Sequence, residues 1–163
     1  MFLRSPVLAL FALMPLAGAA SEPHEVVTRF YHGVRSPGAE GDARAMLGDA
    51  LGKAVDAQRG YEAACERLTL PGEKGHMLDQ SPYLYAPDRP QSVTVGMPRS
   101  NGDAVWLTVD MAVSGDRWTD QVLLQKQGPA WKIMDIRWGQ GGTLIQRLRQ
   151  FSAMRCKIGR AHV

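Results

Sequence analysis

Cysteine, histidine and aromatic residues are scarce in this chain. It has two cysteines and four histidines among 163 residues, and aromatics make up 7% of it. No two of His24, His32 and His76 have the short spacing at which neighbouring side chains bind one metal ion. The chain also has no G-x-S-x-G motif, no phosphate-binding loop and no Cys/His nucleophile arrangement. We therefore expect no metal site and no cofactor.

The chain also lacks an excess of charge of one sign when its two terminal segments are left out of the count. The full chain carries 19 Lys and Arg against 16 Asp and Glu. Arg4, Lys157 and Arg160 lie in terminal segments that we exclude from the folded domain, and without them the count is 16 against 16. A neutral domain lacks the basic surface by which proteins bind nucleic acids or anionic membranes. We therefore expect no nucleic-acid partner.

The longest uncharged apolar run lies close to the N-terminus. A short basic start precedes Pro6–Leu16, and small residues follow this run. The pattern predicts a secretory signal peptide over residues 1–20, cleaved after Ala19 or Ala20, and a periplasmic or secreted protein. A run this short does not span a bilayer stably, so no membrane span is expected; a buried N-terminal helix is the alternative. No cysteine stands at the cleavage point, so no lipid anchor is encoded.

The C-terminal residues 157–163 do not resemble native protein. Ile158–Val163 is the translation, in one reading frame, of a common short-read sequencing adapter. A genuine basic tail is the alternative interpretation. We treat the segment as a non-native tail, which leaves residues 21–156 as a single domain with one core.

The two cysteines allow two interpretations. In an oxidising compartment Cys65 and Cys156 can form a disulfide, and closing so long a loop stabilises a fold by about 4–5 kcal/mol. Alternatively, Cys65 is a small buried apolar residue, because it continues a helical stripe that contains Leu51, Val55 and Tyr61. The sequence leaves both interpretations open.

Apolar spacing predicts helices in the first half of the domain. Apolar residues recur every three or four positions between Ser21 and Val34, which indicates a first helix. The segment Asp42–Leu70 is also helical in pattern, with a break near Gly48. Pro71 follows and ends it.

From Gln91 onward the apolar period changes to two. This alternation predicts four strands, at residues 92–97, 105–113, 117–127 and 131–138. Asn101-Gly102 is a strong hairpin signal, and a last helix is expected after Gly141-Gly142. We therefore expect an α+β fold in which N-terminal helices pack on a curved four-stranded antiparallel meander, with a closing C-terminal helix.

Several short motifs in a fixed order carry a family resemblance. They are Phe30-Tyr31, Leu107-x-Val109-Asp110, Trp118-Thr-Asp120-Gln-Val-Leu123, Trp131-Lys-Ile133-Met-Asp135-Ile-Arg137 and Gly141-Gly-Thr-Leu144. With the order of elements, they resemble the YbjP-like exported bacterial envelope proteins of unknown function, within the nuclear transport factor 2-like superfamily. The resemblance implies a cone-like α+β domain and a place in the cell envelope. The resemblance implies no catalytic residues, and the lipidation cysteine of those proteins is absent from this sequence.

Three charged residues in the predicted strands are catalytic candidates. A turn at Ser114-Gly-Asp116 can place Asp110 opposite Asp120, and the next turn can place Asp120 opposite Arg137. Two carboxylates in an apolar cone would raise one pKa and provide a general acid or base. The alternative is an arginine that relieves two like charges on a solvated sheet face. A bulge near Met134-Asp135 would break this register.

The same register predicts an apolar face formed by Trp106, Leu124 and Ile133. Monomers seldom expose large apolar patches, so this face is expected to contact a second copy or an envelope protein partner, or to line a ligand cavity. Tyr83 and Tyr85, which lie beside prolines, can add to a ligand or partner surface. Alternatively, they pack over the mouth of the cone.

Two classes of function remain. The leading hypothesis is an exported non-catalytic binding or accessory protein of the bacterial cell envelope, supported by the signal pattern, the neutral charge and the lack of a catalytic motif. The alternative is a small-molecule isomerase, dehydratase or hydrolase that uses a carboxylate in the cone. Whether Asp110, Asp120 and Arg137 face a closed cavity or open solvent distinguishes the two.

Overall fold

The structure is a computed structural model that describes residues 22–36, 38–70, 72, 81–86 and 88–156. Its elements, in chain order, are α1 (Pro23–Arg35), α2 (Glu40–Ala45), α3 (Asp49–Glu66), β1 (Ser92–Val95), β2 (Arg99–Asn101), β3 (Ala104–Val113), β4 (Asp116–Gln127), β5 (Ala130–Arg137) and α4 (Leu144–Ser152). The expected signal peptide and non-native tail lie outside the described residues. Within those residues, no helix is both long and apolar enough to cross a membrane.

The helical pattern expected over residues 42–70 forms two helices, α2 and α3. The chain between them bonds to the sheet: the N–H of Ile133 donates to the carbonyl of Met46 at 2.9 Å. The N–H of Gly48 donates in turn to the carbonyl of Ile133 at 2.8 Å. Backbone groups used in this way cannot continue a helix, so the predicted break near Gly48 has a tertiary cause.

The sheet is antiparallel and has the order β1-β3-β4-β5, with β2 pairing β3 beside β1. The α+β class is confirmed, but the sheet has five strands and not the four expected. The difference arises at the edge: Gly96 still donates to the carbonyl of Thr108 at 2.8 Å, whereas Pro98 has no N–H to continue the ladder. The edge therefore consists of two short strands, β1 and β2.

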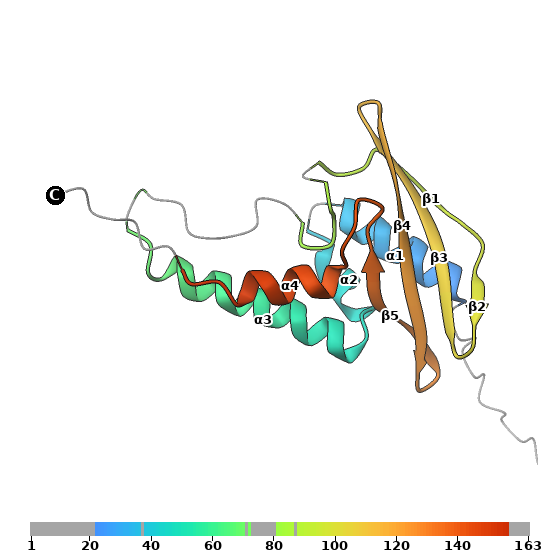
Figure 1. The fold of residues 1–163 in the computed structure, drawn as a ribbon, viewed down its shortest axis with the longest axis horizontal. Coiled ribbons are helices and arrows are strands. Elements are labelled where there is room, and N and C mark those ends of the chain that lie inside the picture. Colours follow the sequence, from blue (N-terminus) through green and yellow to red (C-terminus); the bar gives the residue numbers. More distant parts are fainter. Residues whose placement is uncertain (1–21, 37, 71, 73–80, 87, 157–163) are drawn as a thin grey trace, which may run out of the picture.

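One face of the sheet forms the core together with α1 (Figure 1). On β3 the alternate residues Val105, Leu107, Val109 and Met111 are all buried, as a period of two requires. The helix α1 lies across this face and contacts both β1 and β5. We call this side of the sheet the inner face, and the side that α1 leaves uncovered the outer face.

The helices α3 and α4 pack side by side and extend away from the sheet (Figure 1). Near their far ends the ring of Tyr61 meets the ring of Phe151 edge to face, with centroids 5.4 Å apart. Cys65 and Cys156 form a disulfide there, with a Cα–Cα distance of 5.3 Å. The sequence left open whether the two cysteines pair, and in the structure they do. The disulfide closes a loop with a sequence separation of 91 residues.

Candidate functional site

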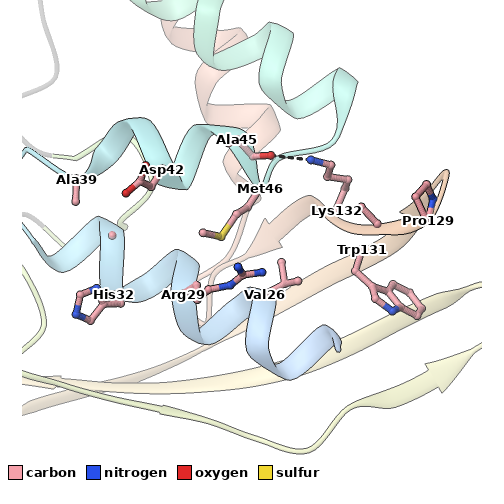
Figure 2. A pocket seen from close by; sticks show the side chains of 12 residues that line it. Val26, Arg29, His32, Ala39, Asp42, Ala45, Met46, Pro129, Trp131 and Lys132 are labelled. Atoms are coloured by element: carbon pink, nitrogen blue, oxygen red, sulfur yellow. Dashed lines mark hydrogen bonds between the residues drawn. The ribbon is translucent and has the colours of Figure 1, made fainter. Parts of the chain in front are cut away.

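A pocket of about 750 Å³ lies between α1, α2 and the hairpin that joins β4 to β5 (Figure 2). Its apolar lining includes Val26 from α1, Met46 from the chain after α2, and Trp131 from β5. This volume is within the range of small-molecule sites, and an apolar lining with a few polar groups is typical of them. We call the pocket the α1–α2 groove.

A hydrogen bond and a close helix approach hold the walls of the α1–α2 groove. The ammonium of Lys132 donates to the carbonyl of Ala45 at 2.7 Å, which ties β5 to the end of α2. At the other side, α1 approaches α2 so closely at Gly33 that a Cβ there would lie 3.1 Å from the carbonyl oxygen of Ala39. A glycine at this position therefore permits the helix spacing that shapes the groove.

The charged groups of the α1–α2 groove are two cations and one carboxylate. The cations are Arg29 and Lys132, the carboxylate is Asp42, and the imidazole of His32 also lines the groove. Figure 2 shows the Arg29 side chain pointing from α1 toward Met46, that is, into the space between the two helices. Arg29 and Lys132 outnumber Asp42, so the charges that line the groove favour a ligand that carries negative charge.

No local sequence pattern indicates the α1–α2 groove. Arg29 and His32 are one helical turn apart on the polar side of α1, a pattern found on any solvated helix face. Trp131 and Lys132 come from a strand about a hundred residues later, and only the tertiary fold brings them to α1. A contact of this kind has no local sequence signature.

The expected row of Asp110, Asp120 and Arg137 is wrong. The turn pairs Val113 with Asp116, one residue earlier than the assumed pairing with Arg117. Since neighbouring residues of a strand point to opposite faces, this shift turns Asp120 to the inner face and leaves Asp110 outside.

The third member of the expected row is also displaced. A bulge lies between Leu123 and Leu124, opposite Met134, as the sequence had allowed. It pairs Arg137 with Gln121, and not with Asp120. Arg137 therefore lies on the outer face, where its guanidinium is 4.9 Å from the ring centroid of Trp106.

The Asp120 side chain is fully buried on the inner face of the sheet. Burial raises the pKa of its carboxyl to about 7, although the N–H of Gly139 donates to Oδ1 at 3.4 Å and opposes the rise. Its other oxygen, Oδ2, has no hydrogen-bond partner among the described residues. The buried hydroxyl of Tyr31 on α1 is equally unpartnered there, and burial, followed by the charge of Asp120, raises the pKa of Tyr31. The inner face thus holds one isolated acid beside a phenol.

The expected apolar contact face of Trp106, Leu124 and Ile133 is also wrong. Leu124 and Ile133 are fully buried on the inner face, while Trp106 is half-buried on the outer face. The bulge and the shifted turn separate them, because each moves a strand by one residue relative to its neighbour.

The two tyrosines differ in exposure. Tyr83 is buried, with its ring 5.4 Å from that of Phe30, so its predicted place on a partner surface is wrong. Tyr85 is 43% exposed, and its ring lies 5.6 Å from that of Trp138. Only Tyr85 can present its side chain to a ligand or a partner.

Among the described residues, no group of three or more His, Cys, Asp or Glu side chains is placed to hold a metal ion. Comparisons with protein-family models, with curated proteins and with solved structures found no match to this chain. The α1–α2 groove and the buried Asp120 are therefore interpreted from their own geometry.

Proposed function

We propose that this chain is an exported, non-catalytic binding or accessory protein of the bacterial cell envelope, and that its ligand occupies the α1–α2 groove. The groove carries the proposal, because it combines ligand-sized volume, a lining of apolar side chains with a few charged ones, and a hydrogen bond from Lys132 to Ala45 that ties two of its walls together. A pre-formed groove binds with a small cost in conformational entropy.

The disulfide supports the proposed periplasmic or secreted location. Disulfides persist in oxidising compartments and are rare in the bacterial cytosol. The signal-peptide pattern of residues 1–20 supports the same location. Cell fractionation with mass spectrometry tests this: we expect a mature protein that begins at Ala20 or Ser21 in the periplasm or medium. A cytosolic protein that retains Met1 would contradict it.

We also propose that the fold is the α+β cone to which the motifs bear resemblance, with the YbjP-like envelope proteins as its relatives. Three features support this: the order of helices before a sheet, the closing helix α4, and the position of α1 across the inner face. A curved sheet closed by helices on one side is compatible with either a binding or a catalytic role.

Native mass spectrometry of protein purified from the periplasm tests binding in the groove. Ala45 lines the groove, so Ala45→Trp should fill it and remove a co-purified small molecule. Ala57→Trp is the matched control, because Ala57 is also an exposed helical alanine but lies on α3, outside the groove. A small-molecule adduct of equal abundance in both variants, or no adduct on the unaltered protein, would contradict the proposal.

A second candidate function is a small-molecule isomerase, dehydratase or hydrolase that uses Asp120. The observation that favours it is the burial of this carboxyl, which raises its pKa to about 7. An acid with this pKa both gives and takes protons near neutral pH, as general acid–base catalysis requires.

Deuterium exchange into small probe ketones, followed by proton NMR, tests this second candidate. A general base that reaches a carbon acid exchanges the proton next to the carbonyl with solvent, and Asp120→Asn should abolish the exchange. Asp110→Asn on the outer face is the control and should leave it unchanged. Exchange at the rate of free solution, or equal exchange in both variants, would contradict a catalytic Asp120.

A further inference from the structure

The pair of helices that extends from the sheet ends in an exposed apolar tip. Leu68 and Leu70 follow α3 and are 53% and 46% exposed, and Met154 follows α4 and is 52% exposed. They are three of the five large apolar side chains that are exposed in the described part of the chain. Exposed apolar side chains that gather in one place mark an interaction site. We call α3, α4 and the residues that follow them, 67–70 and 153–156, the α3–α4 arm.

The disulfide brings the three apolar side chains to the same end of the α3–α4 arm. Cys65 lies three residues before Leu68, Cys156 lies two residues after Met154, and the two cysteine Cα atoms are 5.3 Å apart. Hydrogen bonds hold the chain just beyond each helix: the N–H of Leu68 donates to the carbonyl of Cys65 at 3.0 Å, and the N–H of Met154 to that of Phe151 at 3.2 Å. The tip is therefore a fixed projection at the end of the arm that points away from the sheet (Figure 1).

The charges near the tip are mostly positive. Residues 59–70 and 149–156, which form the outer part of the α3–α4 arm, hold four arginines and two glutamates. Of these arginines, Arg67 and Arg155 are exposed, and each adjoins one of the apolar tip residues in the chain. The domain as a whole is neutral, so this excess is local. Exposed apolar side chains beside arginines are the combination by which peripheral proteins bind anionic lipid.

We propose that the tip of the α3–α4 arm docks on an anionic lipid surface, with Leu68, Leu70 and Met154 inserted at the headgroup level and the arginines on lipid phosphates. A lipid surface fits this tip better than a protein does, because a stable protein interface uses about 20–30 residues on each side. A bilayer accepts a narrow apolar projection, whose binding depends on the apolar area inserted and on the attraction to anionic lipid. None of these residues lines the α1–α2 groove, so the inference is independent of the proposed ligand.

Co-sedimentation with sucrose-loaded vesicles tests the proposal on the mature protein. One set of vesicles is phosphatidylcholine alone, and the other contains an equal share of phosphatidylglycerol. We expect about tenfold tighter binding to the second set, because each basic residue near an anionic surface contributes about fivefold. The preference should disappear at about 1 M salt, where charges are screened within about 3 Å.

The apolar part of the contact is tested by Leu68→Ser combined with Met154→Ser. This variant should bind the phosphatidylglycerol vesicles about tenfold more weakly, because it removes two side chains that enter the lipid. Met97→Ser is the matched control: Met97 is 79% exposed between β1 and β2, away from the arm, and its loss should leave binding unchanged. All three positions are exposed, and melting temperatures show that both variants are folded.

The charged part of the contact is tested by Arg155→Gln. It should weaken binding to the phosphatidylglycerol vesicles about fivefold and leave binding to phosphatidylcholine alone unchanged. Arg117→Gln is the matched control, because it removes an exposed arginine from β4 at the sheet, and it should not alter binding to either set.

Three outcomes overturn lipid docking: no binding to either set of vesicles, equal binding to both, or equal weakening in the arm variants and their controls. If the unaltered protein self-associates, does not bind vesicles, and becomes monomeric with Leu68→Ser and Met154→Ser, the tip is a contact between copies and the proposal is also overturned. Each of these results leaves the proposed function untouched, because the native mass spectra of the Ala45→Trp variant decide that separately.

Discussion

The backbone N–H of Gly139 donates to Oδ1 of Asp120 at 3.4 Å, so the chain that leaves β5 contacts the inner face of β4. Glycine is required at this approach, because a Cβ on residue 139 would lie 2.5 Å from the carbonyl oxygen of Thr119. This one hydrogen bond does not compensate for the removal of water from around the Asp120 carboxyl. Asp120 is therefore costly to bury in its charged form.

The first prediction concerns the pH dependence of stability. The pKa of Asp120 is raised to about 7 in the folded protein, against about 3.9 for an unfolded aspartate. The folded state thus binds the proton of the Asp120 carboxyl more tightly than the unfolded state does. The stabilisation that this gives is complete below pH 4 and is lost as the pH rises to about 7. The free energy of unfolding should fall by about 2–3 kcal/mol between pH 5 and pH 8 through this group.

Urea denaturation across that pH range measures the effect, with Asp120→Asn as the comparison. The asparagine has nearly the shape of the neutral acid and does not titrate, so the difference between the two proteins should grow with pH. Parallel curves for the two proteins would show that the Asp120 carboxyl is not shifted.

The second prediction concerns the disulfide. Replacing both cysteines, as Cys65→Ser with Cys156→Ser, should lower the free energy of unfolding by about 4–5 kcal/mol, because the unfolded chain loses a long closed loop. Guanidinium denaturation of the variant and of the reduced unaltered protein should give the same value. A variant as stable as the oxidised protein would argue against this contribution.

The third prediction concerns the tail. Deletion of residues 157–163 should leave the melting temperature unchanged, since the interpretation as non-native sequence gives it no place in the core. A deletion that also removes Cys156 should lower the melting temperature by many degrees, because the disulfide is lost. A loss of several degrees on the first deletion alone would show that the tail packs on the domain.

The fourth prediction tests the register at the bulge with two adjacent leucines. Leu124 is fully buried, so Leu124→Ala should cost about 2–5 kcal/mol of stability. Leu123 is half-buried and lies on the outer face, so Leu123→Ala should cost about 1 kcal/mol or less. Thermal and chemical denaturation of the two variants measure this, and the reverse order would place the bulge elsewhere.

The fifth prediction concerns the outer face. Trp106→Glu should leave the protein folded, because Trp106 lies outside the core and the new carboxylate meets Arg137 in place of the ring. Light scattering on the same samples measures association: if the outer face binds a second copy, the variant is monomeric at concentrations where the unaltered protein is not. A variant that unfolds would place Trp106 in the core.

The period of apolar residues determined most of the secondary structure. Spacings of three and four predicted the helix that ends near Val34, and alternation predicted the strand that holds Val105–Val113. Glycine at the turns after Asn101, Ser114 and Gln127 fits a left-handed backbone, with φ of +60°, +96° and +62°. These signals are local, since each depends only on residues near it in the chain.

The tertiary structure alone decided which residues meet. One residue of difference at the turn after Val113 sent Asp120 to the core and Asp110 to solvent, and no local pattern fixes a register to one residue. The α1–α2 groove joins Arg29 to Lys132 across most of the chain, and only the packing of α1 against β5 brings them together. The sequence by itself therefore determined the elements, whereas long-range packing, which depends on all of them at once, decided the groove and the buried acid.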